Sequence, residues 1–202
     1  MKTIINKFTK ATNVSASKSI LLATLFSISF IACDKDDNPI APPVNEEELI
    51  TTVKVTLTNG TNVVTLTSKD LDGPNQPVLT VVGTLIANTT YDGVVELLDE
   101  TKNPVDIVSE EIEESEEEKR EHQFFYNLTG LTGSTVYSDF DSNGNPIGLN
   151  FSYTTGAAST GSFTITLRHL PIKTAAGVAS GDITNAGGST DAQATFNDLV
   201  IQ

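Results

Sequence analysis

Apolar residues alternate with polar ones over most of the chain from Leu49 onward, and this period of two is typical of half-buried β-strands. The clearest example is Phe163, Ile165 and Leu167, which are separated by polar residues. Many of the polar positions are threonine, which suits a pleated surface. The alternation predicts strands at residues 53–57, 64–66, 78–82, 91–98, 123–128, 135–140, 149–154, 162–170 and 193–201.

These short strands, with turn residues between them, predict an all-β fold: an antiparallel, Ig-like β-sandwich of about eight or nine strands. A β-barrel is the alternative. Asn59-Gly60 lies between the first two strands, and Asn-Gly in that position is a strong hairpin signal. No segment has the pattern of a convincing amphipathic helix, which argues against a parallel α/β fold. The length of residues 49–202 suits a single domain.

The first 32 residues have the composition of a removable signal peptide. Four lysines and no acidic residue precede an apolar run at 20–31, and the small residue Ala32 follows. As a helix this run would be about 18 Å long, against about 30 Å for the hydrocarbon core of a bilayer. We therefore expect residues 1–32 to be cleaved rather than to span a membrane.

Cys33 is the only cysteine of the chain and directly follows this segment. Phe30, Ile31, Ala32 and Cys33 resemble the lipobox of bacterial lipoproteins, with Phe30 where the family usually has leucine. The resemblance implies that Cys33 is acylated and becomes the new N-terminus, and two or three acyl chains make such an anchor strong. The following Asp34-Lys35-Asp36-Asp37 resembles the signal that sends some Gram-negative lipoproteins to the cell surface. We expect an outer-membrane location. The cell surface is the preferred side, and the periplasmic face is the alternative.

Residues 33–48 read as an acidic, proline-rich tether between the lipid and the domain. After removal of the leader the chain keeps eight Lys and Arg against 26 Asp and Glu, a net charge of −18. Such a charge repels nucleic acid and anionic headgroups and attracts cations, so we expect no nucleic-acid partner. One cysteine also leaves no intrachain disulfide.

Two segments interrupt the strand pattern. Residues 109–121 contain eight glutamates and the single apolar residue Ile112, so repulsion between like charges favours a solvated loop that connects two strands. Ser115 and Glu118 have the spacing of a helix capping box, and a cation-responsive or partner-binding arm is the alternative. Residues 171–191 are rich in Gly, Ala, Ser and Thr and predict a long polar loop before the last strand.

The best candidate for a ligand site is the sequence at 139–145. Asp139, Asp141, Asn143 and Asn145 have the spacing of the first half of a calcium loop, because alternate residues can turn oxygens toward one centre and Gly144 lets the backbone fold back. The flanks predict strands, which excludes an EF-hand. The alternative is a hairpin turn at Asn143-Gly144 whose Asp and Asn side chains make local hydrogen bonds. A shorter and weaker version, Asp70-Leu71-Asp72-Gly73, occurs earlier in the chain.

The chain has two histidines, His122 and His169. In the alternating pattern of its predicted strand, each histidine falls on the same face as the inward residues. We therefore expect both to be structural residues at strand ends. They would need carboxylates to complete a zinc site. Neither a G-x-S-x-G elbow nor a phosphate-binding loop occurs, and we expect no enzymatic activity.

Taken whole, the chain resembles a group of small Gram-negative lipoproteins of unknown role. The resemblance is carried by residues 46–53, 87–91, 167–169 and 181–188. Such proteins are often catalogued under a type 1 periplasmic-binding fold, a two-lobed α/β architecture nearly twice as long, whereas the alternation here predicts strands. We expect an exported, lipid-anchored binding domain for an unknown protein or glycan. A purely structural envelope lipoprotein and a hydrolase with an unrecognised site are the alternatives.

Overall fold

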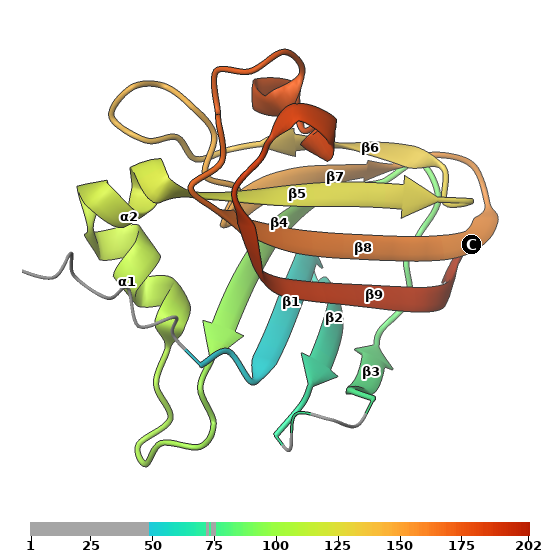
Figure 1. Ribbon diagram of the computed structural model, residues 1–202. Helices are drawn as coiled ribbons and strands as arrows, with labels where there is room; N and C mark the ends of the chain where they lie inside the picture. Colours follow the sequence, from blue (N-terminus) through green and yellow to red (C-terminus); the bar gives the residue numbers. More distant parts are fainter. Residues whose placement is uncertain (1–48, 72, 74–75) are drawn as a thin grey trace, which may run out of the picture. The chain divides into compact units, whose positions relative to one another are not determined.

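The computed structural model describes residues 49–71, 73 and 76–202, which belong to one compact unit. They form nine β-strands and two short α-helices (Figure 1). The strands are β1 (Thr52–Asn59), β2 (Asn62–Lys69), β3 (Val78–Val82), β4 (Thr90–Leu98), β5 (His122–Thr129), β6 (Gly133–Tyr137), β7 (Asn150–Thr155), β8 (Ser159–His169) and β9 (Ser189–Ile201). The helices are α1 (Val108–Glu114) and α2 (Glu116–Glu121), and two 3₁₀ turns are η1 (Val178–Ser180) and η2 (Ile183–Asn185).

The strands form two sheets. One has six strands in the order β3-β2-β1-β4-β7-β6, and the other has three in the order β5-β8-β9. All pairings between named strands are antiparallel, and the three-stranded sheet crosses over β1, β2 and β4 (Figure 1). The predicted all-β sandwich is therefore confirmed. Its division into six and three strands differs from the four and three of an immunoglobulin constant domain.

The core lies between the two sheets and is built by the alternation seen in the sequence. Leu57 and Leu66 of the larger sheet and Phe163 and Ile165 of β8 are at most 1% exposed. The ring of Tyr126 in β5 stacks on Phe151 in β7 with centroids 4.1 Å apart, so aromatic contacts join the two layers. Because side chains of both sheets belong to one continuous cluster, the described domain has one main core.

The first hairpin forms as predicted, but its turn lies one residue later. Asn59 pairs with Asn62, which makes Gly60 and Thr61 the central residues. Gly60 has φ +57°, whereas Thr61 has negative φ. A two-residue hairpin that needs positive φ at its first central position only is of the II′ kind, and glycine is favoured there.

The prediction of a solvated loop at 109–121 is wrong, since this segment forms α1 and α2. Ile112 is 2% exposed, and Val108, just before the predicted loop, is buried beside it against the main core. Ser115 separates the helices and caps the second, because its hydroxyl accepts the backbone N–H of Glu118 at 3.3 Å. Two apolar anchors and one cap therefore outweigh the repulsion among glutamates that point into solvent.

The segment 171–191 is a connection before the last strand, as predicted, but it is more ordered than a polar loop. It contains η1 and η2, and β9 begins within it. Val178 and Ala186 are fully buried in a small cluster with Phe125 of β5. The side-chain amide of Gln123 donates to the Val178 carbonyl at 2.9 Å. The connection thus covers part of the outer face of β5.

Candidate functional site

The predicted calcium loop is a closed turn after β6. Asp141 Oδ1 accepts the backbone N–H groups of Asn143 and Asn145, each at 2.9 Å. The Asp141 carbonyl accepts the N–H of Gly144, whose φ is +80°. These local hydrogen bonds are the ones expected of a hairpin turn.

Asp139 is also engaged by backbone groups. Its Oδ1 accepts the N–H of Gly148 at 2.7 Å, and its Oδ2 accepts the N–H of Asn150 at 3.0 Å. The remaining oxygen, Asp141 Oδ2, accepts Lys173 Nζ at 3.1 Å. Every side-chain oxygen of the two aspartates therefore has a donor within the protein. Calcium binding at this loop stays a prediction, and the conformation of the loop is accounted for without it.

Asp141 and Lys173 form a buried ion pair, with side chains 1% and 5% exposed. Burial would raise the pKa of Asp141, but hydrogen bonds from Asn145 N–H and from Lys173 outweigh it and hold this pKa below its usual value. Burial lowers the pKa of Lys173, and here it outweighs the opposing effect of Asp141. The carboxylate is thus stabilised in its charged form, whereas the ammonium is partly destabilised by leaving water.

In the weaker candidate, Asp70 Oδ1 accepts the N–H of Gly73 at 2.9 Å, which is again a local turn contact. Asp72 lies outside the described residues. Cys33, the leader 1–32 and the tether 33–48 also lie outside them. The predictions made for these segments therefore stay predictions.

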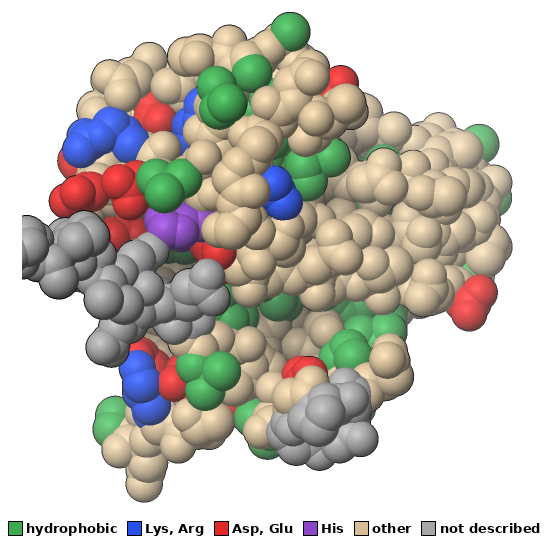
Figure 2. Space-filling view, in the orientation of Figure 1, with side chains coloured by type: hydrophobic (Ala, Val, Ile, Leu, Met, Phe, Trp, Pro, Cys, Tyr) green, Lys and Arg blue, Asp and Glu red, His purple; other side chains and the backbone are tan. Residues whose placement is uncertain are grey.

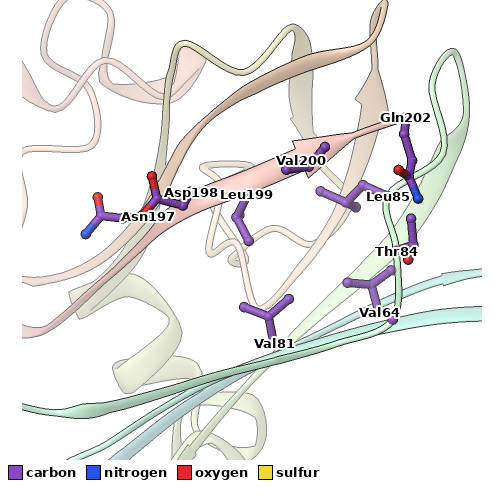
Figure 3. Close-up of a pocket in the computed structure, with 10 residues that line it drawn as sticks. Val64, Val81, Thr84, Leu85, Asn197, Asp198, Leu199, Val200 and Gln202 are labelled. Atoms are coloured by element: carbon purple, nitrogen blue, oxygen red, sulfur yellow. The ribbon is translucent and has the colours of Figure 1, made fainter.

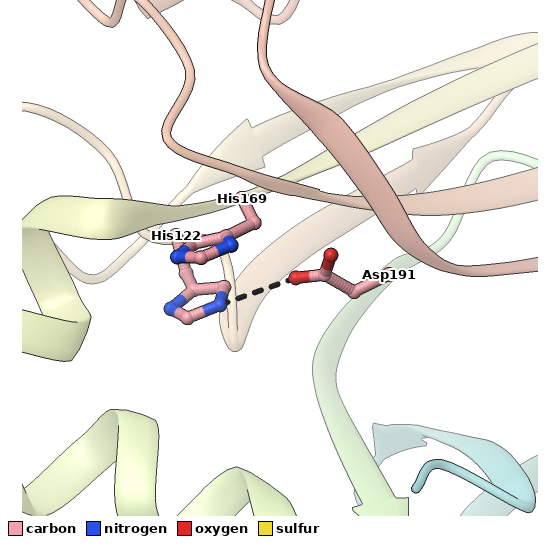
Figure 4. Close-up of side chains that lie close together, drawn as sticks. All are labelled: His122, His169 and Asp191. Carbon is pink, nitrogen blue, oxygen red and sulfur yellow. Dashed lines mark ion pairs between the residues drawn. The ribbon is translucent and has the colours of Figure 1, made fainter. Parts of the chain in front are cut away.

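The two histidines meet at one end of the three-stranded sheet. His122 is the first residue of β5 and His169 the last of β8, and they are directly opposite each other in the antiparallel register. Their rings stack with centroids 4.8 Å apart and an interplanar angle of 11° (Figure 4). They are 9% and 8% exposed. The prediction of buried strand-end residues is confirmed, and the structure adds that the two rings contact each other.

Three carboxylates surround this pair. Asp191, near the start of β9, places Oδ2 3.3 Å from His122 Nε2 (Figure 4). Glu118 of α2 places Oε2 3.2 Å from His122 Nδ1, and Glu121 places Oε2 3.6 Å from His169 Nε2. The ligand atoms of His122, His169 and Asp191 all lie within 4.8 Å of one another, so these residues could hold a metal ion. We call His122, His169 and Asp191 the histidine cluster.

Both ring nitrogens of His122 face acceptors. Nδ1 lies 3.1 Å from the carbonyl oxygen of Glu118, and Nε2 faces the carboxylate of Asp191. Burial would lower the pKa of His122, but the hydrogen bonds to Asp191 and to the Glu118 carbonyl outweigh it and raise the pKa above its ordinary value of 6.5. A neutral imidazole has one N–H and can satisfy only one of these acceptors.

The cluster does not form a Ser-His-Asp relay with Ser189 of β9. Ser189 Oγ donates to Asp191 Oδ1 at 3.4 Å rather than to an imidazole. A hydrolytic relay needs the serine hydroxyl on a histidine nitrogen and the carboxylate on the other nitrogen of the same ring. Here the carboxylate of Asp191 contacts both Ser189 and His122. The serine hydroxyl is therefore hydrogen-bonded to the carboxylate and not to a histidine nitrogen.

A second candidate site is a groove of about 260 Å³ at the open edge of the sandwich. Val64 of β2 and Val81 of β3 form one wall, and Leu85 and Leu199 face them (Figure 3). Hydrophobic side chains are visible in this hollow in Figure 2. Polar groups from a bulge of β9 lie at its rim, where Asp198 has φ +56°. The groove exists because the three-stranded sheet is narrower than the sheet it covers.

Strand β3 borders this groove and is exposed on both faces. All five of its residues are exposed, including Val78 at 68% and Val82 at 61%. Among the described residues it pairs with β2 alone, so its other edge keeps unpaired backbone groups. An apolar free edge is a template for another strand, and proteins usually protect such edges with charges or prolines. Residues 78–82 contain neither.

Comparisons of the chain with protein-family models, with curated proteins and with solved structures find no match. Among the described residues, no helix is both long enough and apolar enough to cross a membrane. The sites are therefore interpreted from their own geometry.

The sequence does not indicate that Asp191, Glu118 and Glu121 are neighbours of the histidines. Glu118 and Glu121 lie in a helix with many other glutamates, and Asp191 lies in a segment whose composition predicts a polar loop. Composition alone therefore does not distinguish these carboxylates from the others. The available signal was the position of both histidines at the ends of predicted strands. It became informative only once the register placed β5 beside β8.

Proposed function

We propose that this protein is an exported, lipid-anchored envelope protein whose β-sandwich binds an extended segment of a protein partner along β3. The leader and Cys33 support the anchoring, and the binding role depends on the exposed apolar edge of β3. We propose binding rather than catalysis, and a partner rather than a purely structural spacer.

Three properties of the β3 edge indicate what kind of segment binds there. The unpaired N–H and C=O groups of β3 can hydrogen-bond an added strand. The groove beside it exposes Val81 and Val200, at 46% and 49%, and alternate side chains of that strand can contact them. Asp198 at the rim, together with the strongly negative net charge of the chain, favours a Lys or Arg next to the apolar segment.

A protein ligand is favoured over a glycan because the described surface offers few aromatic platforms. The chain has no tryptophan, and Phe140 is the large aromatic side chain exposed among the described residues. Phe140 belongs to the turn after β6 and does not line the groove. Apolar aliphatic side chains are instead concentrated on β3, where they suit a peptide strand.

The binding proposal can be tested in intact cells of the producing organism with the full chain. A photo-reactive amino acid replaces Val82 on β3, and the matched control carries it at the similarly exposed Val136 on β6. A specific cross-linked partner from Val82 but not from Val136 is expected, and Val81→Lys should abolish it while Val136→Lys should not. The purified partner should then bind the chain with the same dependence on Val81.

Two results would overturn the proposed partner. A cross-linked species of twice the mass of the chain would show that β3 pairs with a second copy. No cross-link at Val82 above that at Val136 would favour the structural spacer. Anchoring is tested separately by mass spectrometry of Cys33 from cell envelopes, where an unmodified thiol or an intact leader would refute it.

A further inference from the structure

We propose that the histidine cluster, formed by His122, His169 and Asp191, is a binding site for a divalent transition-metal ion of the zinc type. This site is separate from the β3 groove and does not depend on the proposed partner.

The ligand set has the composition that zinc prefers. Two imidazoles and one carboxylate recur in protein zinc sites, with Zn–N and Zn–O distances of about 2.0–2.2 Å. Calcium and magnesium select oxygen ligands instead, so the two imidazoles favour a transition metal. The only two histidines of the chain converge here from distant positions, because the register of β5 with β8 places them side by side.

The hydrogen-bonding inventory of His122 supports a cation at this place. Nδ1 lies 3.1 Å from the Glu118 carbonyl oxygen, which can only accept a hydrogen bond. With Nδ1 directed at this carbonyl, Nε2 is the nitrogen that faces Asp191 Oδ2, at 3.3 Å. This nitrogen and this oxygen therefore converge on one point, which a metal ion can occupy. A backbone carbonyl that fixes the N–H of a histidine is also the usual support for a metal-binding imidazole.

Two of the three ligand atoms already have the separation that a zinc site requires. In a tetrahedral zinc site two ligand atoms lie about 3.3 Å apart. His122 Nε2 and Asp191 Oδ2 are already 3.3 Å apart, and the cluster as a whole spans 4.8 Å. In two stacked imidazole rings, the lone pairs of the ring nitrogens lie in parallel planes and do not meet at one point. The ring of His169 must therefore turn to direct a nitrogen at the ion that His122 and Asp191 bind. The backbone of His169 is held by its pairing with His122 and with Ser189, so this movement is a rotation of the side chain.

Charge favours a divalent ion as well. Asp191, Glu118 and Glu121 bring three carboxylates to the two imidazoles, and among the described residues no Lys or Arg lies within ion-pair distance of these three. Glu118 or Glu121 can supply a further oxygen ligand after a side-chain rotation. Asp191 also lines a hollow of about 260 Å³, and histidine reaches the surface next to acidic side chains in Figure 2, so an ion has a route to the cluster.

The test is a titration of the full chain in detergent with Zn²⁺, after removal of metals with a chelator. Every sample carries Cys33→Ala so that no thiol competes for the metal. Calorimetry should give one ion per chain, and His169→Gln and Asp191→Asn should each weaken binding about tenfold or more. Glu113→Gln, an exposed carboxylate of α1, is the matched control and should leave the affinity unchanged. Mg²⁺ should not compete.

If a ligand variant does not fold, a spectroscopic measurement on the chain that keeps His122, His169 and Asp191 still tests the proposal. The chain has two histidines, so the imidazole nitrogens give a simple ¹⁵N NMR spectrum. One equivalent of Zn²⁺ should shift nitrogen signals of both rings. Zinc binding that leaves both rings unshifted, or affinity equal in Asp191→Asn and Glu113→Gln, would overturn the proposal. So would the absence of saturable binding, which would leave a proton between His122 and Asp191.

Discussion

Lys173 Nζ lies 3.1 Å from Asp141 Oδ2, and the same ammonium group donates to the carbonyl oxygen of Lys119 at 2.5 Å. One buried cation therefore joins the end of α2, the turn after β6 and the connection that precedes β9. None of the three segments belongs to a named β-strand, so side-chain contacts such as this one join them. We infer that this pair organises the loops near the histidine cluster.

Removing the cation from this pair should destabilise the domain strongly. Lys173→Met leaves the Asp141 carboxylate buried without its partner, and we expect a loss on the order of 3 kcal/mol in the free energy of unfolding. Denaturant unfolding measures it. The double variant Lys173→Met/Asp141→Asn removes both charges and should recover part of the loss. A double variant as unstable as the sum of the single ones would show that the two side chains do not interact.

Acid should weaken the domain through Asp141. Because the pKa of Asp141 is lowered in the fold, its contribution is present above the ordinary value of 3.8 and is lost as pH falls through the folded value. The midpoint of urea unfolding should therefore fall below about pH 4. Asp141→Asn should show a shallower decline over that range. Equal slopes in the two proteins would contradict the assignment to Asp141.

Alkali should unfold the domain as buried tyrosines ionise. Burial raises the pKa of Tyr137 and of Tyr153 to about 12, and it raises the pKa of Tyr126 well above its usual range. Since the fold favours the neutral phenols, this stability is complete below pH 10 and is lost as pH rises through about 12. Near-ultraviolet absorbance should show these rings ionising later in the native protein than in guanidinium. Coincident titrations would refute their burial.

Adding one methyl group at Gly93 should disturb the core. A Cβ at this position in β4 would lie 2.5 Å from the ring of Phe151, which is 1% exposed and has little room to move. We expect Gly93→Ala to cost about 1–3 kcal/mol. Asp92→Ala, at the neighbouring exposed position, should stay within about 0.5 kcal/mol of the parent protein. Thermal melting of both variants provides the comparison.

The helix cap formed by Ser115 should contribute measurably to the free energy of unfolding. Ser115→Ala removes the acceptor for the Glu118 N–H, with an expected loss of about 1 kcal/mol. Ser115→Asn keeps an acceptor at the same place and should retain most of the stability. Chemical unfolding gives both values. A Ser115→Asn variant as unstable as Ser115→Ala would indicate that the hydroxyl acts through another contact.

The strands could be predicted because their signal is local. Phe163, Ile165 and Leu167 alternate with polar residues, and such a segment can bury one face only as a strand. The helical segment could not be predicted in the same way. Its stability depends on Ile112 and Val108, which pack in a core whose other members come from strands throughout the chain.

The sequence by itself determined the all-β class and the approximate positions of the nine strands, because spacing along the chain decides both. Only the tertiary structure decided which strands are neighbours. That pairing brought His122, His169 and Asp191 together and left β3 without a partner on one edge. Register depends on how two whole faces fit across a shared core, and no short stretch of sequence contains that information.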